Sequence, residues 1–155
     1  MIRVETVEDA AGLAAAWRVR EEVFVVEQAV PVEEEIDALD TAPTTAHALA
    51  WLDGDLVATG RLLPEEEGTV HVGRVAVRAP ARGRGVGAAL MAHLEGLALA
   101  RHGIRDGDHL VVCVALSAQE QAMGFYTRLG YAVVTGERYL DAGIWHQDME
   151  RRIRV

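Results

Sequence analysis

The 155-residue chain has a single cysteine, Cys113, and no hydrophobic run approaching the roughly 20 residues of a membrane crossing. One cysteine excludes a disulfide within the chain, so the reducing cytoplasm is the expected compartment. The first residues, Met1 to Glu5, lack the apolar core of a signal peptide. We therefore expect a cytoplasmic protein that has no membrane partner.

Positive charge is also scarce. The chain holds 15 basic residues, all of them arginine, against 24 acidic ones, for a formal net charge of −9. Such an acidic chain excludes nucleic acid as a general partner. The three tryptophans are scattered, which favours packing over a platform for stacked bases. The six histidines show no tight ligand spacing, so no metal site is expected.

Apolar periodicity and turn residues predict the order β-α-(irregular)-β-β-β-α-β-α-β-β. Asp53-Gly54-Asp55 lies between two apolar runs, as in a β-hairpin, and Gly130 fits the position just past a helix end. Thr6 and Asp9 resemble a capping box before the first helix. The expected strands span residues 2–7, 46–52, 56–63, 69–77, 110–115, 131–134 and 146–153, and the expected helices span 10–23, 85–102 and 119–129, with 24–40 irregular.

The connections between these elements define a sheet topology. Strands 46–52, 56–63 and 69–77 are joined by tight turns and must be antiparallel. The helix at 85–102 then crosses over to strand 110–115, which makes that strand parallel to 69–77. The expected fold class is α/β, with a mixed, mainly antiparallel central sheet and flanking helices in a single domain over residues 1–155. A ligand is expected at the C-terminal end of strand 69–77.

A loop rich in glycine and arginine follows that strand. It reads Arg82-Gly83-Arg84-Gly85-Val86-Gly87 and opens onto an Ala/Leu-rich helix. Alternate glycines let backbone N–H groups converge on one point, at which the helix also aims its positive dipole end. The chain lacks the Gly-Lys-Ser/Thr of a P-loop and the acidic residue of a dinucleotide fold. The loop is expected to hold the phosphates of a large anionic cofactor.

The Arg-x-x-Gly-x-Gly form of this loop, in this strand order, resembles the GNAT N-acetyltransferase superfamily. A second block is similar to that superfamily's cofactor-side helix: Leu116-Ser117-Ala118-Gln119, then Ala122, Phe125-Tyr126 and Leu129-Gly130-Tyr131. A third set resembles the narrower ElaA-like branch: the run from Arg20 to Gln28, Glu35-Ile36-Asp37 with Asp40, and Tyr139 with the run from Gly143 to His146 and Met149. The resemblance covers nearly the whole chain.

The resemblance implies the acyl-CoA N-acyltransferase fold, in which the parallel strand pair is splayed and acetyl-CoA, the co-substrate, lies in the gap. The strand backbone would hold the pantetheine arm, and an arginine of the loop would pair with a phosphate. The implied cofactor-binding residues are Val75, Ala76, Val77, Arg82, Gly83, Arg84, Gly85, Val86, Gly87, Ala88, Ala115, Ser117, Ala122 and Phe125.

The implied general acid is Tyr126. Its hydroxyl has an ordinary pKa of about 10 and can protonate a departing thiolate. Helical spacing alone equally allows Phe125, Tyr126 and Leu129 to be a packed face of an amphipathic helix. A backbone N–H near Val75 is implied to polarise the thioester carbonyl.

The general base and the acceptor site stay open. Candidates for the base are Glu27, Asp37, His71 and His146, and each could instead have a structural role. Arg74 either binds an acceptor carboxylate or pairs with a neighbouring acid. The acidic stretch at 33–40 either attracts a cationic amine or is a solvated loop.

The predicted function is an N-acetyltransferase that moves an acetyl group from acetyl-CoA to a primary amine by direct attack in a ternary complex. A route through Cys113 is disfavoured because that residue lies in an apolar strand run. The alternatives are a non-catalytic acyl-CoA-binding sensor or regulatory module, and a nucleotide-binding regulator that prefers ATP. The acceptor is a small-molecule or peptide amine, and a homodimer is one possible assembly.

Overall fold

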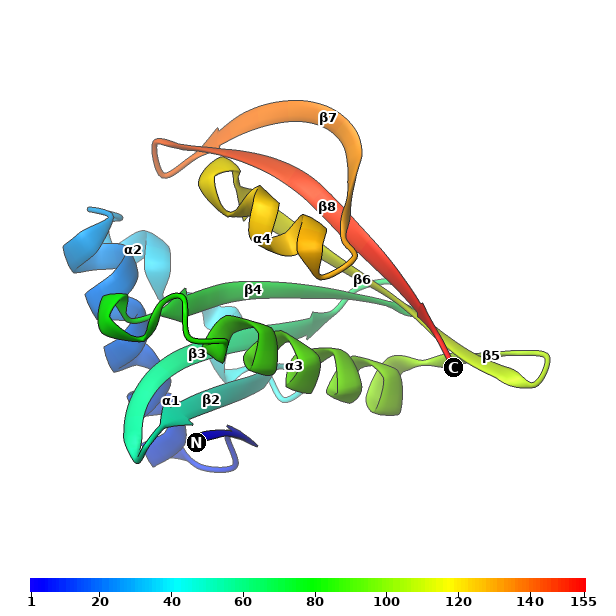
Figure 1. The fold of residues 1–155 in the computed structure, drawn as a ribbon, viewed down its shortest axis with the longest axis horizontal. Coiled ribbons are helices and arrows are strands. Elements are labelled where there is room, and N and C mark those ends of the chain that lie inside the picture. The colour runs from blue at the N-terminus through cyan, green and yellow to red at the C-terminus, as the bar shows by residue number, and fades with distance from the viewer.

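The computed structural model describes residues 1–155 and shows one sheet of eight strands with helices on both faces (Figure 1). The strand order is β1-β2-β3-β4-β6-β8-β7, with β5 paired to β6. None of the helices combines the length and apolar character needed to cross a bilayer. The strands are β1 (Ile2–Thr6), β2 (Ala46–Leu52), β3 (Asp55–Pro64), β4 (Thr69–Val77), β5 (Ile104–Asp106), β6 (His109–Gln119), β7 (Ala132–Asp141) and β8 (Ile144–Arg154).

Four α-helices and four short helical turns connect these strands. The α-helices are α1 (Ala10–Arg20), α2 (Val32–Glu35), α3 (Val86–His102) and α4 (Met123–Arg128). The π-helical turn η1 (Glu21–Glu27) continues α1, and the 3₁₀ turns are η2 (Ala38–Thr41), η3 (Ala79–Ala81) and η4 (Glu120–Ala122).

The expected hairpin between β2 and β3 is confirmed. Asp53 and Gly54 have φ values of 51° and 89°, the left-handed pair that a two-residue hairpin turn requires. β1 to β4 form a continuous antiparallel run. In this run Ala48 and Ala50 face α3 while Leu49 between them faces α1, so the two helices cover opposite sides of the sheet.

The parallel pair is confirmed as well, and it is short. β4 and β6 pair over four positions, from Thr69 opposite Cys113 to Val72 opposite Leu116. β4 continues to Val77 and β6 to Gln119 without pairing to each other. α3 is the crossover between them, and Leu90, Met91 and Leu94 of α3 are fully buried in the main core. Each such side chain contributes about 1.5–3 kcal/mol by leaving water.

Several local expectations were wrong. α1 ends at Arg20 and widens into η1, so the regular helix is shorter than the apolar spacing indicated. The predicted helix from residue 119 begins later, because Gln119 belongs to β6 and α4 starts at Met123. The strand predicted at 131–134 extends to Asp141, and β5 was not expected at all. β5 and the added part of β7 are almost entirely exposed, so neither carries the apolar periodicity from which a strand is predicted.

Two smaller predictions also changed. Asp9 alone caps α1 by accepting from the Gly12 N–H, while the Thr6 hydroxyl bonds to His93, so no capping box forms. Cys113 is partly exposed, because it faces away from the core that holds Val112 and Val114 on either side of it. Gly130 has a φ of 98° just after α4, as its position predicted.

Candidate active site

A cavity of about 670 Å³ lies where β4 and β6 separate. Residues 71–77 of β4 form one wall, and Leu116, Ser117 and Gln119 of β6 form another. Tyr126 of α4, the η1 segment and the turn between β7 and β8 complete the lining. Figure 1 shows this hairpin and the α1–α2 connection at the same end of the molecule, beyond the C-terminal ends of β4 and β6. A cavity therefore lies at the C-terminal end of β4, where the sequence predicted a ligand.

The β4 wall contains a β-bulge. Arg61 of β3 pairs with Gly73 and Thr59 pairs with Ala76, so Arg74 and Val75 together oppose Gly60. Arg74 has a φ of 51°, a left-handed conformation that is costly for a non-glycine residue. The bulge lies just past the last parallel pair with β6, so it redirects the β4 backbone inside the cavity wall.

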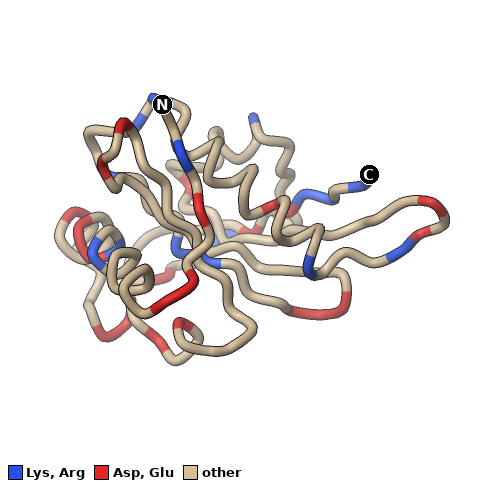
Figure 2. The backbone as a smooth tube through the Cα atoms, turned by 90° about the horizontal axis from the view of Figure 1, so that it is seen from below, with Lys and Arg blue, Asp and Glu red and all other residues tan.

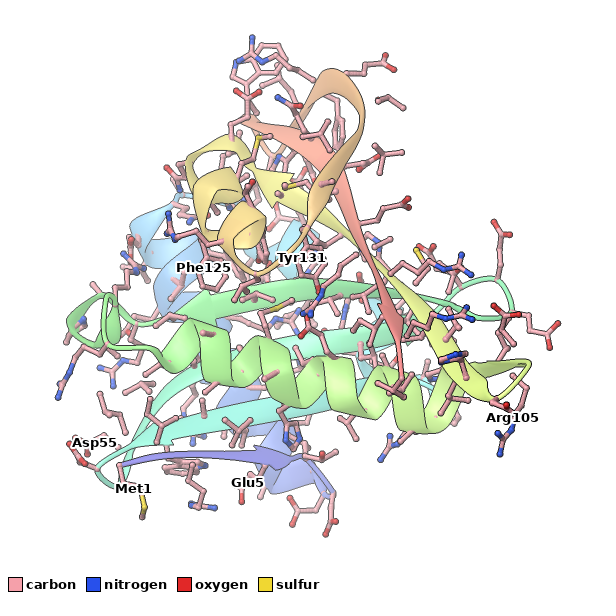
Figure 3. All side chains as sticks on the ribbon, turned by 45° about the vertical axis from the view of Figure 1, so that its right-hand side comes forward. Met1, Glu5, Asp55, Arg105, Phe125 and Tyr131 are labelled. Carbon is pink, nitrogen blue, oxygen red and sulfur yellow. The ribbon has the colours of Figure 1, made fainter.

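The glycine-rich loop adopts the conformation that its sequence predicted. Gly83 and Gly85 have φ values of 75° and 82°, and α3 begins directly after Gly85 without a side-chain cap. The first N–H groups of this 17-residue helix are therefore available to an anion. A Cβ on Gly87 would lie 3.0 Å from Phe125, so this glycine lets α4 pack against α3 (Figure 3).

Arg82 and Glu27 join the two sides of the cavity. Both guanidinium Nη atoms of Arg82 donate to the Glu27 carboxylate, at 2.6 and 2.7 Å, and Nε donates to the carbonyl of Val77. Hydrogen bonding from Arg82 lowers the pKa of Glu27, which makes this carboxylate a weaker base. Arg84 instead lines a second, smaller cavity of about 310 Å³ beside Asp53 and Asp55.

Tyr126 fits both interpretations of its helix, as a packing residue and as a cavity residue. Its ring packs edge-on against Phe125 and Tyr131, and it belongs to the main core. The residue also lines the cavity and is 8% exposed. Burial alone raises the pKa of Tyr126 to about 12, so its hydroxyl stays protonated at any physiological pH.

Two histidines lie at the cavity wall. His71 of β4 has Nδ1 3.3 Å from the carboxylate of Glu65, and burial lowers its pKa despite Glu65 and Asp148. It is thus neutral at pH 7. His146 of β8 is buried, with Nδ1 at 2.7 Å from the carbonyl of Ile144, and its ring stacks on Tyr139.

The acidic stretch at 33–40 is mostly paired within the fold. Buried Arg20 donates to Glu35 at 2.6 Å and to Asp40 at 2.7 Å, and Arg61 donates to Asp37 and Asp40 at 2.8 and 2.9 Å. Burial opposes ionisation of Asp40, but hydrogen bonds from Arg20, Arg61 and Trp17 outweigh it and lower its pKa to about 2. These carboxylates therefore stabilise the fold through their ion pairs with the two arginines.

Eleven of the predicted site residues line the large cavity: Glu27, His71, Arg74, Val75, Ala76, Val77, Arg82, Ser117, Ala122, Tyr126 and His146. Asp37 lies outside the lining and is held by Arg61 and Arg74. The other predicted cofactor residues also lie outside it: Ala115 pairs with His71 before the strands part, Val86 is buried in the core, Phe125 packs on Gly87, and Gly83, Arg84, Gly85, Gly87 and Ala88 belong to the loop and the start of α3.

Further polar side chains line the cavity beside the predicted site residues. Gln28 and Gln119 exchange amide hydrogen bonds at 2.8 and 3.3 Å, and Gln121 donates to Gln119 at 2.8 Å. Ser117 bonds to the Tyr139 hydroxyl, which also donates to Asp148 at 2.6 Å. Glutamine carries no charge or motif spacing of its own, so only the resemblance, which included Gln28, Gln119 and Tyr139, pointed to these positions.

Charge is distributed in local pairs. Figure 2 shows basic residues interspersed among acidic ones along the backbone, with no single face reserved for one sign. No group of three or more His, Cys, Asp or Glu side chains is placed to hold a metal ion. Recognition in the cavity therefore depends on the particular hydrogen-bonding groups of its wall.

The fold and the cavity define a protein of the acyl-CoA N-acyltransferase type, with a mixed sheet and one short parallel pair that parts around the site. Residues 13–131 match the model of the Acetyltransferase (GNAT) family. The crystal structure of an acyl-CoA N-acyltransferase from Pseudomonas aeruginosa is 37% identical, with a TM-score of 0.80 over 97% of this chain and 99% of that one. These comparisons confirm the predicted fold class.

Two further relatives define the branch. The protein named uncharacterized N-acetyltransferase YjcF of Bacillus subtilis is 39% identical over 137 residues, 88% of this chain and 90% of that protein. Protein ElaA of Escherichia coli is 36% identical over 91% of this chain and 88% of its own length, and its crystal structure superposes with a TM-score of 0.80. The chain belongs to the GNAT acetyltransferase family, in its ElaA-like branch. It is an acyltransferase enzyme with an acyl-CoA co-substrate.

Proposed function

We propose that residues 1–155 form one N-acetyltransferase unit that transfers acetyl from acetyl-CoA directly to a primary amine in a ternary complex. The observation that carries this proposal is the cavity between the parted ends of β4 and β6, because the glycine-rich loop and Arg82 lie at its β4 end and His71 lies on its wall. A substrate in this gap meets strand backbone, a buried hydroxyl and a neutral imidazole together.

The chain's own groups fit an acyl-CoA. Backbone N–H groups of the loop and the start of α3, with Arg82, would hold the diphosphate, and residues 75–77 would hold the pantetheine arm. A Cβ on Gly83 would meet nothing within 4 Å, and one on Gly85 would meet only Ile2, at 3.8 Å. The co-substrate supplies an activated acetyl thioester, and the protein supplies orientation and proton transfer.

His71 is the favoured general base among the four candidates. Glu27 is bound by Arg82 and Asp37 is bound by two arginines. Of the two histidines, His146 is buried at 8% exposure, whereas the side chain of His71 is 30% exposed on the β4 wall. His71 is neutral, its Nδ1 lies 3.3 Å from the Glu65 carboxylate, and its Nε2 would accept a proton from the acceptor's ammonium group, directly or through water, before the amine attacks. Backbone N–H groups at the bulge would polarise the carbonyl while Tyr126 protonates the departing thiolate.

Calorimetric titration with acetyl-CoA, followed by a thiol-release assay over a panel of amines, tests the proposal. We expect a Kd of about 1 µM to 1 mM and turnover with at least one amine. The chain has no lysine, so acetylation of its own lysine side chains does not contribute to the thiol released in this assay. Binding without turnover over the whole panel would favour the sensor alternative, and absence of binding would remove the proposal altogether.

His71→Gln is expected to lower kcat by about 100-fold, because the amine then loses its proton acceptor. The wild type should lose activity as the pH falls through the pKa of His71, which burial holds below 6.5, because only the neutral imidazole accepts a proton. A pH–rate profile measures both effects. His109→Gln, at an exposed histidine at the start of β6, should keep the wild-type profile. An unchanged acid limb in His71→Gln would assign the base to another residue.

A further inference from the structure

Arg74 has a conformation that its residue type makes costly. Four non-glycine residues have positive φ: Asp53 and Ala142 lie in turns and Ala29 lies in the connection after η1, whereas Arg74 lies within a strand. A left-handed conformation is strained for a non-glycine residue, and glycine would adopt the same backbone without strain. The strained conformation therefore indicates that the Arg74 side chain makes contacts that glycine could not replace.

The Arg74 guanidinium is fixed on the acceptor side of the cavity. Its Nε donates to the carbonyl of Glu35 at 3.1 Å, and one Nη donates to the carbonyl of Glu34 and the carboxylate of Asp37, each at 3.3 Å. These partners all belong to the segment that runs from α2 to η2. One side chain thus connects the β4 bulge to that segment.

The segment itself is held by buried ion pairs. Arg20 is 1% exposed and bonds to Glu35 and Asp40, while Arg61 bonds to Asp37 and Asp40. With Arg74 the cluster contains three guanidinium groups and three carboxylates, so the charges balance within it. Such a connected, buried network is rigid, because a shift of any member would leave another without its partner.

α3 fixes the bulge from the opposite face of the sheet. A Cβ on Gly60, the residue opposite the bulge, would lie 2.8 Å from Leu94 of α3, so β3 approaches the helix as closely as glycine permits. Val75 lies 3.6 Å from the same point. The bulge is therefore enclosed between α3 on one face and the guanidinium tether on the other.

We propose that Arg74 is a positioning residue: its guanidinium ties the β4 bulge to the α2–η2 segment and thereby fixes the backbone N–H groups that polarise the thioester carbonyl. This inference rests on the proposed acetyl transfer. It differs from direct binding of an acceptor carboxylate by Arg74, because a positioning role acts on the carbonyl before any acceptor is present.

Infrared difference spectroscopy of acetyl-CoA labelled with ¹³C at the thioester carbonyl tests the proposal without an acceptor. In the wild type we expect the bound carbonyl band at lower frequency than in water. In Arg74→Gly the band should return toward its position in water, while the Kd for acetyl-CoA changes by less than about threefold, because the diphosphate loop is untouched. With an amine identified by the assay above, kcat should fall about 10- to 100-fold.

Arg74→Gly also separates positioning from stability. Glycine relieves the backbone strain, so the variant should stay folded while losing the band shift, and added guanidinium at millimolar concentration should restore part of it. Arg105→Ala, at an exposed arginine of the β5–β6 hairpin far from the cavity (Figure 3), should behave as the wild type. A wild type that does not bind acetyl-CoA would contradict the proposed function. A wild-type band shift that survives in Arg74→Gly, or a raised KM for the amine alone, would overturn the positioning role.

Discussion

Tyr126→Phe is expected to lower kcat by about 100-fold or more while the acetyl-CoA Kd stays within about threefold of the wild type. The substitution removes only the hydroxyl, and the ring keeps its edge-on contacts with Phe125 and Tyr131. Because burial raises the pKa of Tyr126 to about 12, the hydroxyl is a permanent proton donor. A thiolate formed in the same buried site is itself poorly solvated. Burial therefore raises the pKa of the leaving thiol and favours proton transfer to it.

The matched control is Tyr131→Phe. Tyr131 is 2% exposed and packs on Tyr126, but its hydroxyl donates to Glu95 at 2.7 Å, on the side of α3. Its loss should cost about 1 kcal/mol of stability and leave kcat within about threefold. Steady-state kinetics and calorimetry on both variants decide the question. Equal kcat values for Tyr126→Phe and the wild type would reduce Tyr126 to a packing residue.

Arg20→Met is expected to lower the free energy of unfolding by about 3–5 kcal/mol, because it leaves Glu35 and Asp40 as buried carboxylates without their main partner. Burial raises the pKa of Glu35 even though Arg20 bonds to it, so without Arg20 the buried carboxylate would be largely uncompensated. Urea denaturation at pH 7 measures the change. Arg18→Ala, an exposed arginine of the same helix, should stay within about 0.5 kcal/mol of the wild type.

This effect has a definite pH dependence. The folded-state pKa of Asp40 lies at about 2, below its ordinary 3.8, so its pairing stabilises the fold above pH 4 and is lost as the pH falls toward 2. Protonation of Glu35 removes the penalty of its uncompensated charge over the acid range as well. The difference between the wild type and Arg20→Met should therefore narrow below pH 4. A constant difference from pH 7 to pH 3 would show that Arg20 stabilises the fold by packing alone.

The glycine-rich loop and the elements on either side of it were predictable because they lie in contiguous sequence. A strand, a loop with alternate glycines and a helix follow one another from residue 75 to residue 88, and backbone conformation at Gly83 and Gly85 follows from residue type. Tyr126 was identified from a local motif, and its place at the cavity agrees with that reading. The position of Arg84 was not predictable in this way. The loop sequence does not distinguish Arg84 from Arg82, yet the Arg84 side chain lines the second, smaller cavity.

The acceptor side was not predictable in the same way. Glu27, Asp37, His71 and His146 were equal candidates for the base, and what separates them is the set of partners and the burial that the fold gives each one. Arg82 occupies Glu27 across 55 residues, Arg61 occupies Asp37 across 24, and Glu65 leaves one nitrogen of His71 free. The acidic stretch at 33–40 could have attracted a cationic amine or been a solvated loop. Instead, three arginines from α1, β3 and β4 neutralise most of its charge.

The sequence alone determined the class of fold, the order of its main elements, the parallel crossover and the glycine-rich loop, because periodicity, turn chemistry and connection length act over short stretches of chain. Only the tertiary structure decided where β4 and β6 part, which residue carries the bulge, and which carboxylates are already paired. Those outcomes depend on burial and on contacts between segments distant in sequence. Burial and neighbouring charges set the pKa of each ionisable side chain, and the pKa decides which proton transfers that side chain can make.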